Sequence, residues 1–201
     1  MVWNTEETRR RIKQAATDEF AEHGLHGTTI ERIAKRAGVN KERIYNYFGD
    51  KEQLFATVLS GELANVAAAV PIGSLADEDI GEYAGRVFDY HAEHPQLTRL
   101  LLWEGLAYGD REVPDEPQRA AYYRAKAEAI AAAQREGTIA QQPQAADLML
   151  FLIGLGAWSH AVPQIARMLT QTNGQSPKER ARRRAAAVHA ARQLAGSTAR
   201  P

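Results

Sequence analysis

Apolar residues recur along most of the chain at spacings of three and four positions, which is typical of amphipathic helices. Ile12, Ala16 and Phe20, for example, form a stripe of one residue every four. Glycine and proline interrupt the pattern at intervals, and no segment alternates well enough to predict a strand. We therefore predict an all-α protein of about nine helices. Their expected ranges are 5–24, 30–38, 40–49, 51–69, 77–94, 95–108, 118–136, 145–169 and 178–195. Pro163 is expected to kink or end the eighth of them.

Residues 28–51, TTIERIAKRAGVNKERIYNYFGDK, predict two short helices that meet at a tight turn. Ala34 is small where a second helix would cross closely, and Gly38 lies where the turn needs a positive φ. Ile44 and Phe48, four residues apart, would face inward on the second helix, which leaves its polar side outward. This spacing predicts a helix-turn-helix, whose second helix fits the major groove of DNA.

Residues 9–55 resemble the DNA-binding domain of the TetR/AcrR family of bacterial transcriptional regulators. The residues that carry the resemblance are Phe20, Gly24, Thr28-Thr29-Ile30, Ile33-Ala34, Ala37-Gly38-Val39, Ile44-Tyr45, Tyr47-Phe48 and Lys51. The resemblance implies a three-helix DNA-binding domain, placed at residues 1–51. It also implies a helical domain at residues 52–201 that binds a ligand and dimerises.

The resemblance also implies a role for each residue of the expected DNA-binding face. Thr28 and Thr29 would cap a helix whose N-terminus can hold a phosphate. Tyr47 and Lys51 match positions that clamp the DNA backbone, and Lys41, Glu42, Arg43 and Tyr45 match positions that read bases. Glu42 departs from the family, where a small residue is common, so the operator sequence cannot be carried over. The full expected DNA-binding set is Thr28, Thr29, Asn40, Lys41, Glu42, Arg43, Tyr45, Asn46, Tyr47 and Lys51.

The distribution of charge adds a modest argument for nucleic acid, although the net charge is zero. Residues 1–51 hold ten Lys and Arg against eight Asp and Glu, a net charge of +2. Residues 52–177 hold eight against sixteen, a net charge of −8, and residues 178–201 hold seven against one, a net charge of +6. We read the basic run at Arg180–Arg184 as the solvated face of the last helix.

The segment 145–158, AADLMLFLIGLGAW, is apolar nearly all round. Two interpretations stay open: a central helix within one subunit, or a helix shared between that core and a dimer interface. The family resemblance favours the second, with helices 145–160 and 178–195 of two subunits forming a four-helix bundle. The predicted interface residues are Leu152, Gly156, Ala187 and Ala191.

An aromatic-lined cavity for an unknown small-molecule effector is expected in the second domain. Its candidate residues are Phe88, His91, Trp103, Glu104, Tyr108, Tyr123, Phe151 and Trp158. His91 and His94 are three residues apart, but no further ligand stands at a suitable spacing, so no metal and no cofactor are expected.

The predicted function is a transcriptional regulator of the repressor type, a homodimer that binds a pseudo-palindromic double-stranded DNA operator and is released by a small molecule. The chain has no cysteine, no phosphate-binding glycine loop and no nucleophile motif, which disfavours an enzyme. An all-helical enzyme and a helix-turn-helix module for protein contacts remain the alternatives. No signal peptide and no membrane-spanning segment are expected, and we expect a cytoplasmic location.

Overall fold

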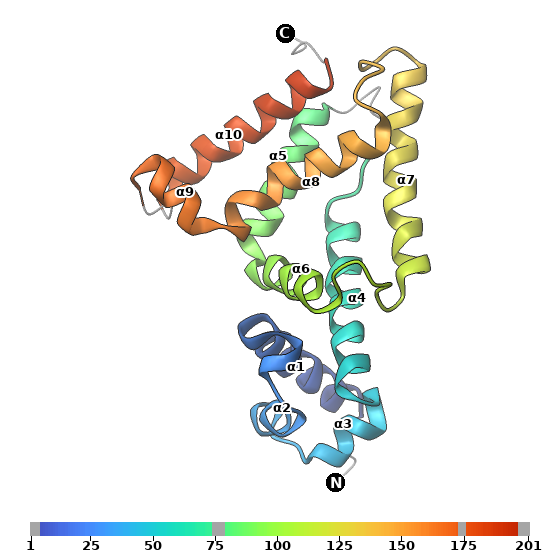
Figure 1. Ribbon diagram of the computed structural model, residues 1–201, viewed down its shortest axis with the longest axis vertical. Coiled ribbons are helices and arrows are strands. Elements are labelled where there is room, and N and C mark those ends of the chain that lie inside the picture. Colours follow the sequence, from blue (N-terminus) through green and yellow to red (C-terminus); the bar gives the residue numbers. More distant parts are fainter. Residues whose placement is uncertain (1–4, 74–78, 173–175, 197–201) are drawn as a thin grey trace. The chain divides into compact units, whose positions relative to one another are not determined.

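The computed structural model describes residues 5–73, 79–172 and 176–196 (Figure 1). Within these ranges the chain forms ten helices and no strand, which confirms the predicted all-α fold. The helices are α1 (Thr5–Gly27), α2 (Ile30–Ala37), α3 (Lys41–Phe48), α4 (Lys51–Ala69), α5 (Ile80–Glu93), α6 (Pro95–Tyr108), α7 (Glu116–Arg135), α8 (Ala145–Ala161), α9 (Pro163–Thr170) and α10 (Pro177–Leu194). They divide into two compact units. Unit 1 comprises residues 1–65 and 96–116, and unit 2 comprises residues 66–95 and 117–201.

The tenth helix comes from Pro163, which starts a new helix rather than bending an existing one. Proline has no backbone N–H to donate and a fixed φ, so it suits the first turn of a helix. Here it follows Val162 and begins α9, at an angle of 81° to α8. The predicted helix at 145–169 is therefore two helices.

Unit 1 is built on an apolar core between α1, α2, α3 and α4. Ile12, Ile33 and Ile44 are fully buried, and the rings of Phe20 on α1 and Phe55 on α4 meet edge to face at 5.1 Å. The inward direction of Ile44 and Phe48 on α3 is as the sequence predicted. The helix α3 is therefore fixed by its apolar side, and its other side remains exposed.

A buried carboxylate links α1 to α2. Glu19 is only 6% exposed, and its oxygens accept hydrogen bonds from the Thr28 hydroxyl at 2.9 Å, Arg32 Nε at 3.1 Å and Arg36 Nη1 at 3.2 Å. Burial alone would raise the pKa of Glu19. The bonds from Thr28 and Arg36 and the charges of Arg32 and His23 outweigh that effect, so its pKa lies below the ordinary 4.5.

The helix α6 also belongs to unit 1, where it covers a break in α1. Gly24 leaves the helical conformation with φ 71°, as expected for a residue predicted to end the first helix. The carbonyls exposed by this break are satisfied from α6: Arg99 donates to the carbonyls of Ala21 and Glu22, and the Trp103 indole donates to Ala21. The Trp103 ring lies over Gly24, where a Cβ would come within 2.6 Å of it.

Unit 2 is centred on α5, which packs against α8 and α10 (Figure 1). Ion pairs run along the whole length of the α5 and α10 pair. Arg192 pairs with Asp79, Arg184 with Asp89 at 2.7 Å and Glu82 at 3.0 Å, and Arg180 with Glu93 at 3.2 Å. Arg180 and Arg184 of the basic run that we predicted as a solvated face therefore pair with acidic residues of α5, whereas Arg182 pairs with Glu179 of α10 and is 52% exposed.

The four predicted interface residues lie inside unit 2. Leu152 and Ala191 are 0% exposed, Ala187 is buried, and a Cβ on Gly156 would meet Val87 Cγ1 at 2.5 Å and the Phe88 backbone nitrogen at 3.0 Å. These residues form the contact of α8 and α10 with α5 of the same chain, so they cannot provide the surface of a subunit interface. The sequence predicted these four residues at a subunit interface, whereas in the structure they lie on the buried sides of α8 and α10.

No single helix among the described residues is both long and apolar enough to cross a membrane, although the bent pair α8 and α9 together reaches that length and composition.

Replacing Glu19 by Gln should lower the free energy of unfolding at pH 7 by roughly 1–3 kcal/mol, because an amide cannot accept all three charge-assisted hydrogen bonds. The folded-state pKa of Glu19 is depressed, so its contribution is present above about pH 4.5 and is lost as the pH falls through the folded pKa. Urea denaturation at pH 7 and at lower pH should therefore show a difference from the wild type that shrinks in acid. Glu22→Gln, at an exposed carboxylate of the same helix, should change little. An equal loss at both pH values would contradict this role.

Replacing Gly156 by Ala should lower the free energy of unfolding by about 1–3 kcal/mol, because the new methyl group meets a stiff Val87 side chain and the backbone of α5. Gly105→Ala is the matched control. It lies within α6 with nothing within 4 Å, and should gain up to about 1 kcal/mol from helix propensity. Urea denaturation of both variants checks this, and a Gly156→Ala protein as stable as the wild type would show that α5 and α8 pack less closely.

Candidate DNA-reading face and ligand site

The turn between α2 and α3 is held by backbone and side-chain bonds. Gly38 adopts the left-handed conformation with φ 65°, and its N–H closes the end of α2. Arg11 of α1 donates to the carbonyls of Ala37 and Gly38, so the first helix also fixes the turn. Thr29 caps α2 by accepting from Arg32 N at 3.3 Å, as predicted from the sequence.

The outer side of α3 is available to a partner. Lys41, Glu42, Tyr45 and Asn46 are exposed, with Tyr45 at 48%, and Asn40 is exposed just before the helix. Arg43 and Tyr47 are half-buried. A helix of this length, anchored by its apolar side, can present these side chains to base edges in the major groove.

Two of the expected phosphate contacts have other partners in the protein. Thr28 is buried, and its hydroxyl donates to Glu19, so its side chain does not point outward. Lys51 is half-buried and its Nζ donates to the Thr28 carbonyl at 3.1 Å, which ties the start of α4 to the start of α2. The Lys51 ammonium has three N–H donors, so two remain for a phosphate.

Arg9 was not predicted from the sequence, although it lies beside the aromatic residues of α3. Its guanidinium lies 5.5 Å from the centroid of the Tyr47 ring and 5.3 Å from that of Phe48. It therefore places a cation of α1 next to α3. The sequence held one signal, an arginine in the first turns of a helix packed on α3.

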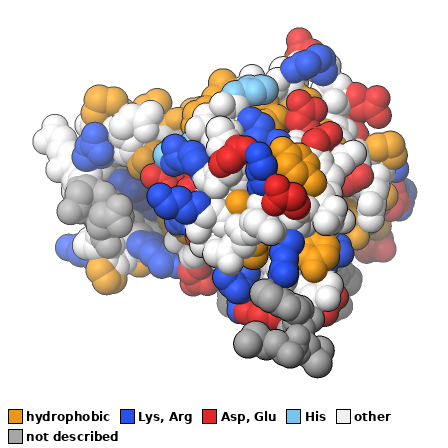
Figure 2. All heavy atoms as spheres, turned by 90° about the horizontal axis from the view of Figure 1, so that it is seen from below, with side chains coloured by type: hydrophobic (Ala, Val, Ile, Leu, Met, Phe, Trp, Pro, Cys, Tyr) orange, Lys and Arg blue, Asp and Glu red, His pale blue; other side chains and the backbone are white. Residues whose placement is uncertain are grey.

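Lys and Arg side chains are intermixed with Asp and Glu side chains in the view of Figure 2. Within unit 1, Lys41 of α3 lies 3.5 Å from Glu31 of α2. A mixed surface attracts DNA less strongly through unspecific charge than a continuous basic patch does. More of the binding must then come from contacts made by individual side chains.

The predicted ligand residues are distributed over both units. Trp103, Glu104 and Tyr108 lie in unit 1, and the other five lie in unit 2. Trp103 packs on α1, as described above, and Glu104 is buried. In unit 2, Phe88 and His91 are buried, whereas Tyr123, Phe151 and Trp158 are exposed on α7 and α8. Phe151 and Trp158 therefore line the outside of unit 2 and not its interior.

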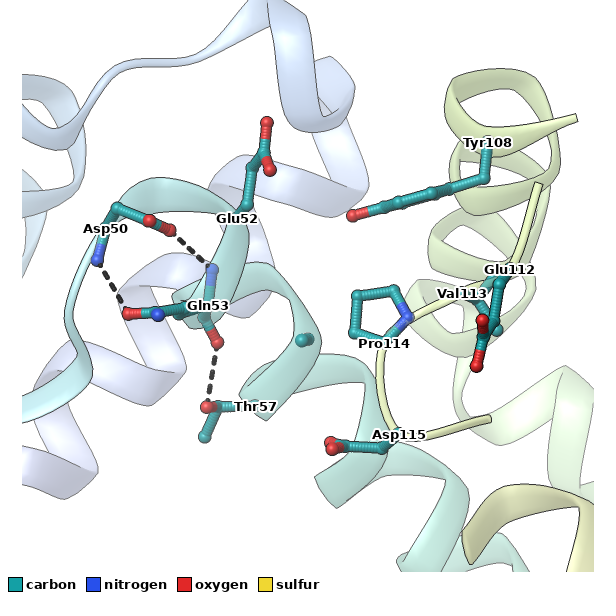
Figure 3. A pocket seen from close by; sticks show the side chains of 10 residues that line it. Asp50, Glu52, Gln53, Thr57, Tyr108, Glu112, Val113, Pro114 and Asp115 are labelled. Carbon is teal, nitrogen blue, oxygen red and sulfur yellow. Dashed lines mark hydrogen bonds between the residues drawn. The ribbon is translucent and has the colours of Figure 1, made fainter. Parts of the chain in front are cut away.

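A pocket of about 610 Å³ lies in unit 1, between the start of α4 and the segment that follows α6 (Figure 3). Four carboxylates line it, from Asp50, Glu52, Glu112 and Asp115, and Tyr108 is its one aromatic residue. Burial raises the pKa of Tyr108, and the charges of Glu52 and Glu104 add to the rise. This acidic pocket is different from the aromatic-lined cavity that we predicted.

The same pocket shows how α4 begins. Asp50 accepts a hydrogen bond from the Gln53 backbone at 2.8 Å, and the Gln53 side chain accepts one from the Asp50 backbone at 3.2 Å (Figure 3). This reciprocal capping holds the first turn of α4 next to α3.

An apolar surface runs along the outer side of α8. Leu150, Phe151 and Trp158 are 65%, 46% and 59% exposed, and Gly154 lies between them, where an added Cβ would have nothing within 4 Å. The neighbouring α10 carries small exposed residues at the same spacing, namely Ala181 and Ala185. Large exposed apolar patches of this kind mark interaction surfaces.

Comparison with known proteins agrees with this arrangement over both parts of the chain. Residues 12–58 match the bacterial regulatory proteins of the tetR family, and residues 79–193 match the tetracyclin repressor-like C-terminal domain. The HTH-type transcriptional repressor SCO4008 of Streptomyces coelicolor is 43% identical over 164 residues, which are 82% of this chain and 84% of that protein. The HTH-type transcriptional repressor NicS of Pseudomonas putida is 38% identical over 106 residues, 51% of this chain and 50% of that protein.

The structure of SCO4942 from Streptomyces coelicolor superposes with a TM-score of 0.78 and 32% identity, covering 93% of this chain and 97% of that one. The matched families and relatives are transcriptional regulators and not enzymes, which removes the enzyme alternative. The chain belongs to the TetR family of bacterial transcriptional regulators, and its helix-turn-helix is the DNA-binding element of that family.

Proposed function

We propose that this regulator is a homodimeric repressor that binds a pseudo-palindromic operator in the cytoplasm and releases it when a small molecule binds. Residues 1–51 would read the DNA, and residues 52–201 would bind the ligand and dimerise. The observation that carries the proposal is the exposed polar side of α3 on a rigid apolar base. The relatives named as repressors support the sign of regulation.

A second copy is needed because one short helix makes few base contacts. Two copies related by a twofold axis double those contacts and read two half-sites about 34–36 Å apart. We assign the subunit interface to the outer side of α8, with Leu150, Phe151 and Trp158, and to the exposed small residues of α10. This replaces the inward residues predicted from the sequence.

On the outer side of α3, we assign contacts with DNA bases to five residues. They are the exposed Lys41, Glu42, Tyr45 and Asn46, together with Arg43. Thr29, Asn40, Tyr47 and Lys51 would position the DNA backbone. Glu42 would accept a hydrogen bond from cytosine N4, since a carboxylate cannot donate to a base. Ligand release would follow from the differential affinity of the effector for the free and DNA-bound conformations.

Replacing Tyr45 by Ala should cost about 1–3 kcal/mol in affinity for the preferred sequence and relax the base preference, with the salt dependence nearly unchanged. Lys51→Ala should weaken binding to all sequences and reduce the salt slope by about one. The test is selection of binding sites from random duplex DNA, then fluorescence anisotropy at several salt concentrations. Thermal unfolding of the Lys51→Ala protein without DNA measures the effect of losing the bond to Thr28. The loss of a phosphate contact affects only DNA binding, so the two effects can be separated.

If wild-type protein selected no sequence from the random pool, or bound DNA without salt dependence, the helix-turn-helix would serve protein contacts instead. If Lys51→Ala changed the base preference and left the salt slope intact, the division between base and backbone contacts would be wrong.

Replacing Trp158 by Glu should convert the dimer to a monomer in sedimentation velocity and lower operator affinity more than tenfold, because a charge is forced into an apolar interface. Tyr123→Glu is the control, since Tyr123 is also exposed but lies on α7, outside the assigned interface. A Trp158→Glu protein that sediments as a tight dimer would place the interface elsewhere.

A further inference from the structure

Three buried polar atoms of α8 and α10 lack a hydrogen-bond partner. They are Ser159 Oγ and His160 Nε2 at the end of α8, and Arg183 Nε on α10. A buried polar atom that has lost water and gained no partner is costly, and native proteins leave few of them. An ordered water or a bound group that pairs with such atoms is the ordinary explanation.

The helix geometry directs these side chains toward the interior of unit 2. The buried stripe of α8 passes through Leu152 and Gly156, and positions 159 and 160 continue it three and four residues further on. The His160 ring lies 4.6 Å from the Phe88 ring of α5, measured between centroids. Arg183 comes four residues before the buried Ala187 of α10. The charge of Arg183 is close enough to His160 to lower the pKa of that imidazole.

Arg183 differs from the arginines around it in forming no ion pair among the described residues, although its charge helps to lower the pKa of Glu179. Arg180 pairs with Glu93, Arg182 with Glu179, and Arg184 with Asp89 and Glu82. Arg183 instead bonds to a hydroxyl, that of Thr170 on α9, which accepts from Nη2 at 3.3 Å. The buried Nε of Arg183 is thus left without a carboxylate that accepts its hydrogen bond among the described residues.

We propose that Arg183, His160 and Ser159 form a binding site for the carboxylate of a small apolar organic acid. Arg183 Nε would donate a charge-assisted hydrogen bond to one carboxylate oxygen, and Ser159 and protonated His160 would donate to the other. The Phe88 ring beside His160 offers an apolar wall for the remainder of the ligand. The inference rests on the proposed function, because it gives the chemical class of the effector.

Carboxylate binding at this site should take up a proton. Burial, followed by the charges of Arg180 and Arg183, lowers the pKa of His160, and the backbone of Phe88 and the charge of Asp89 act in the opposite sense. An adjacent carboxylate favours the protonated imidazole, so affinity rises as the pH falls from 8 toward 6. His91 also faces His160, but burial and the charges of His160 and His94 lower its pKa to about 4, and it does not titrate in that range.

The test uses benzoate as the probe, with benzamide as its uncharged analogue and inorganic phosphate as a second anion. Isothermal titration calorimetry of the full chain should give a lower dissociation constant for benzoate at pH 6 than at pH 8. Arg183→Gln should weaken it by about tenfold to a hundredfold, the effect of one lost charge-assisted hydrogen bond. Arg182→Gln, at the neighbouring arginine whose guanidinium is turned to Glu179, should leave the affinity unchanged.

His160→Gln provides a second, independent readout should Arg183→Gln fold poorly. It should bind benzoate more weakly and lose the pH dependence, with unchanged thermal unfolding in the absence of ligand. The proposal is overturned if benzoate does not bind, if benzamide binds equally well, if phosphate alone binds, or if neither variant changes the affinity. A structure from crystals grown with saturating benzoate that shows water on these three atoms overturns it as well.

The effector role is measured separately, by DNA anisotropy with and without benzoate. Binding of benzoate without any change in operator affinity supports the carboxylate site and contradicts only the ligand-release part of the proposed function. If the ligand-free wild-type protein did not bind DNA, that result would contradict the proposed function. The calorimetric evidence for the carboxylate site would be unaffected.

Discussion

The DNA-reading part of this protein depends on how one buried carboxylate is satisfied. Moving Glu19 out of water is unfavourable unless its charge is paired and its oxygens accept hydrogen bonds. The donors come from Thr28, Arg32 and Arg36, which all lie in or just before α2. The carboxylate therefore fixes the direction in which α2 leaves α1. Since Gly38 and the start of α3 follow directly, the position of the reading helix is set by the same contact.

Pairing between carboxylates and arginines also organises unit 2, over a longer distance. Acidic residues of α5 face arginines of α10 along the whole pair, and half-exposed ion pairs of this kind contribute little energy each. Their value lies in register, because sliding α10 by one turn would separate Arg180, Arg184 and Arg192 from the carboxylates that they face. Against this regular pairing, Arg183 is the exception. Its Nε is buried and accepted by no partner in the described chain, and the proposed ligand would supply one.

The helix-turn-helix could be predicted from the sequence because its determinants are local. Gly24, Gly38 and Thr29 act on their own neighbours, and the spacing of Ile44 and Phe48 indicates the buried side of α3 without reference to other helices. The role of Glu19 could not be predicted, since its partners lie 9 to 17 residues away and only the fold brings them together. The internal bonds of Thr28 and Lys51 could not be predicted for the same reason, because sequence gives no sign that each bonds within the protein.

The case of α8 shows where periodicity stops being informative. A helix that is apolar nearly all round has no polar side to identify its outward direction, so Leu152 and Trp158 look equivalent in the sequence. The structure separates them, because α5 covers Leu152 and Gly156 completely and leaves Leu150, Phe151 and Trp158 in solvent. A helix embedded on one side only, with large exposed apolar residues at helical spacing on the other, carries the kind of surface that marks an interaction site. The two interpretations left open by the sequence are therefore compatible: one side of α8 forms the core of a subunit, and the other side is the surface that a second subunit would cover.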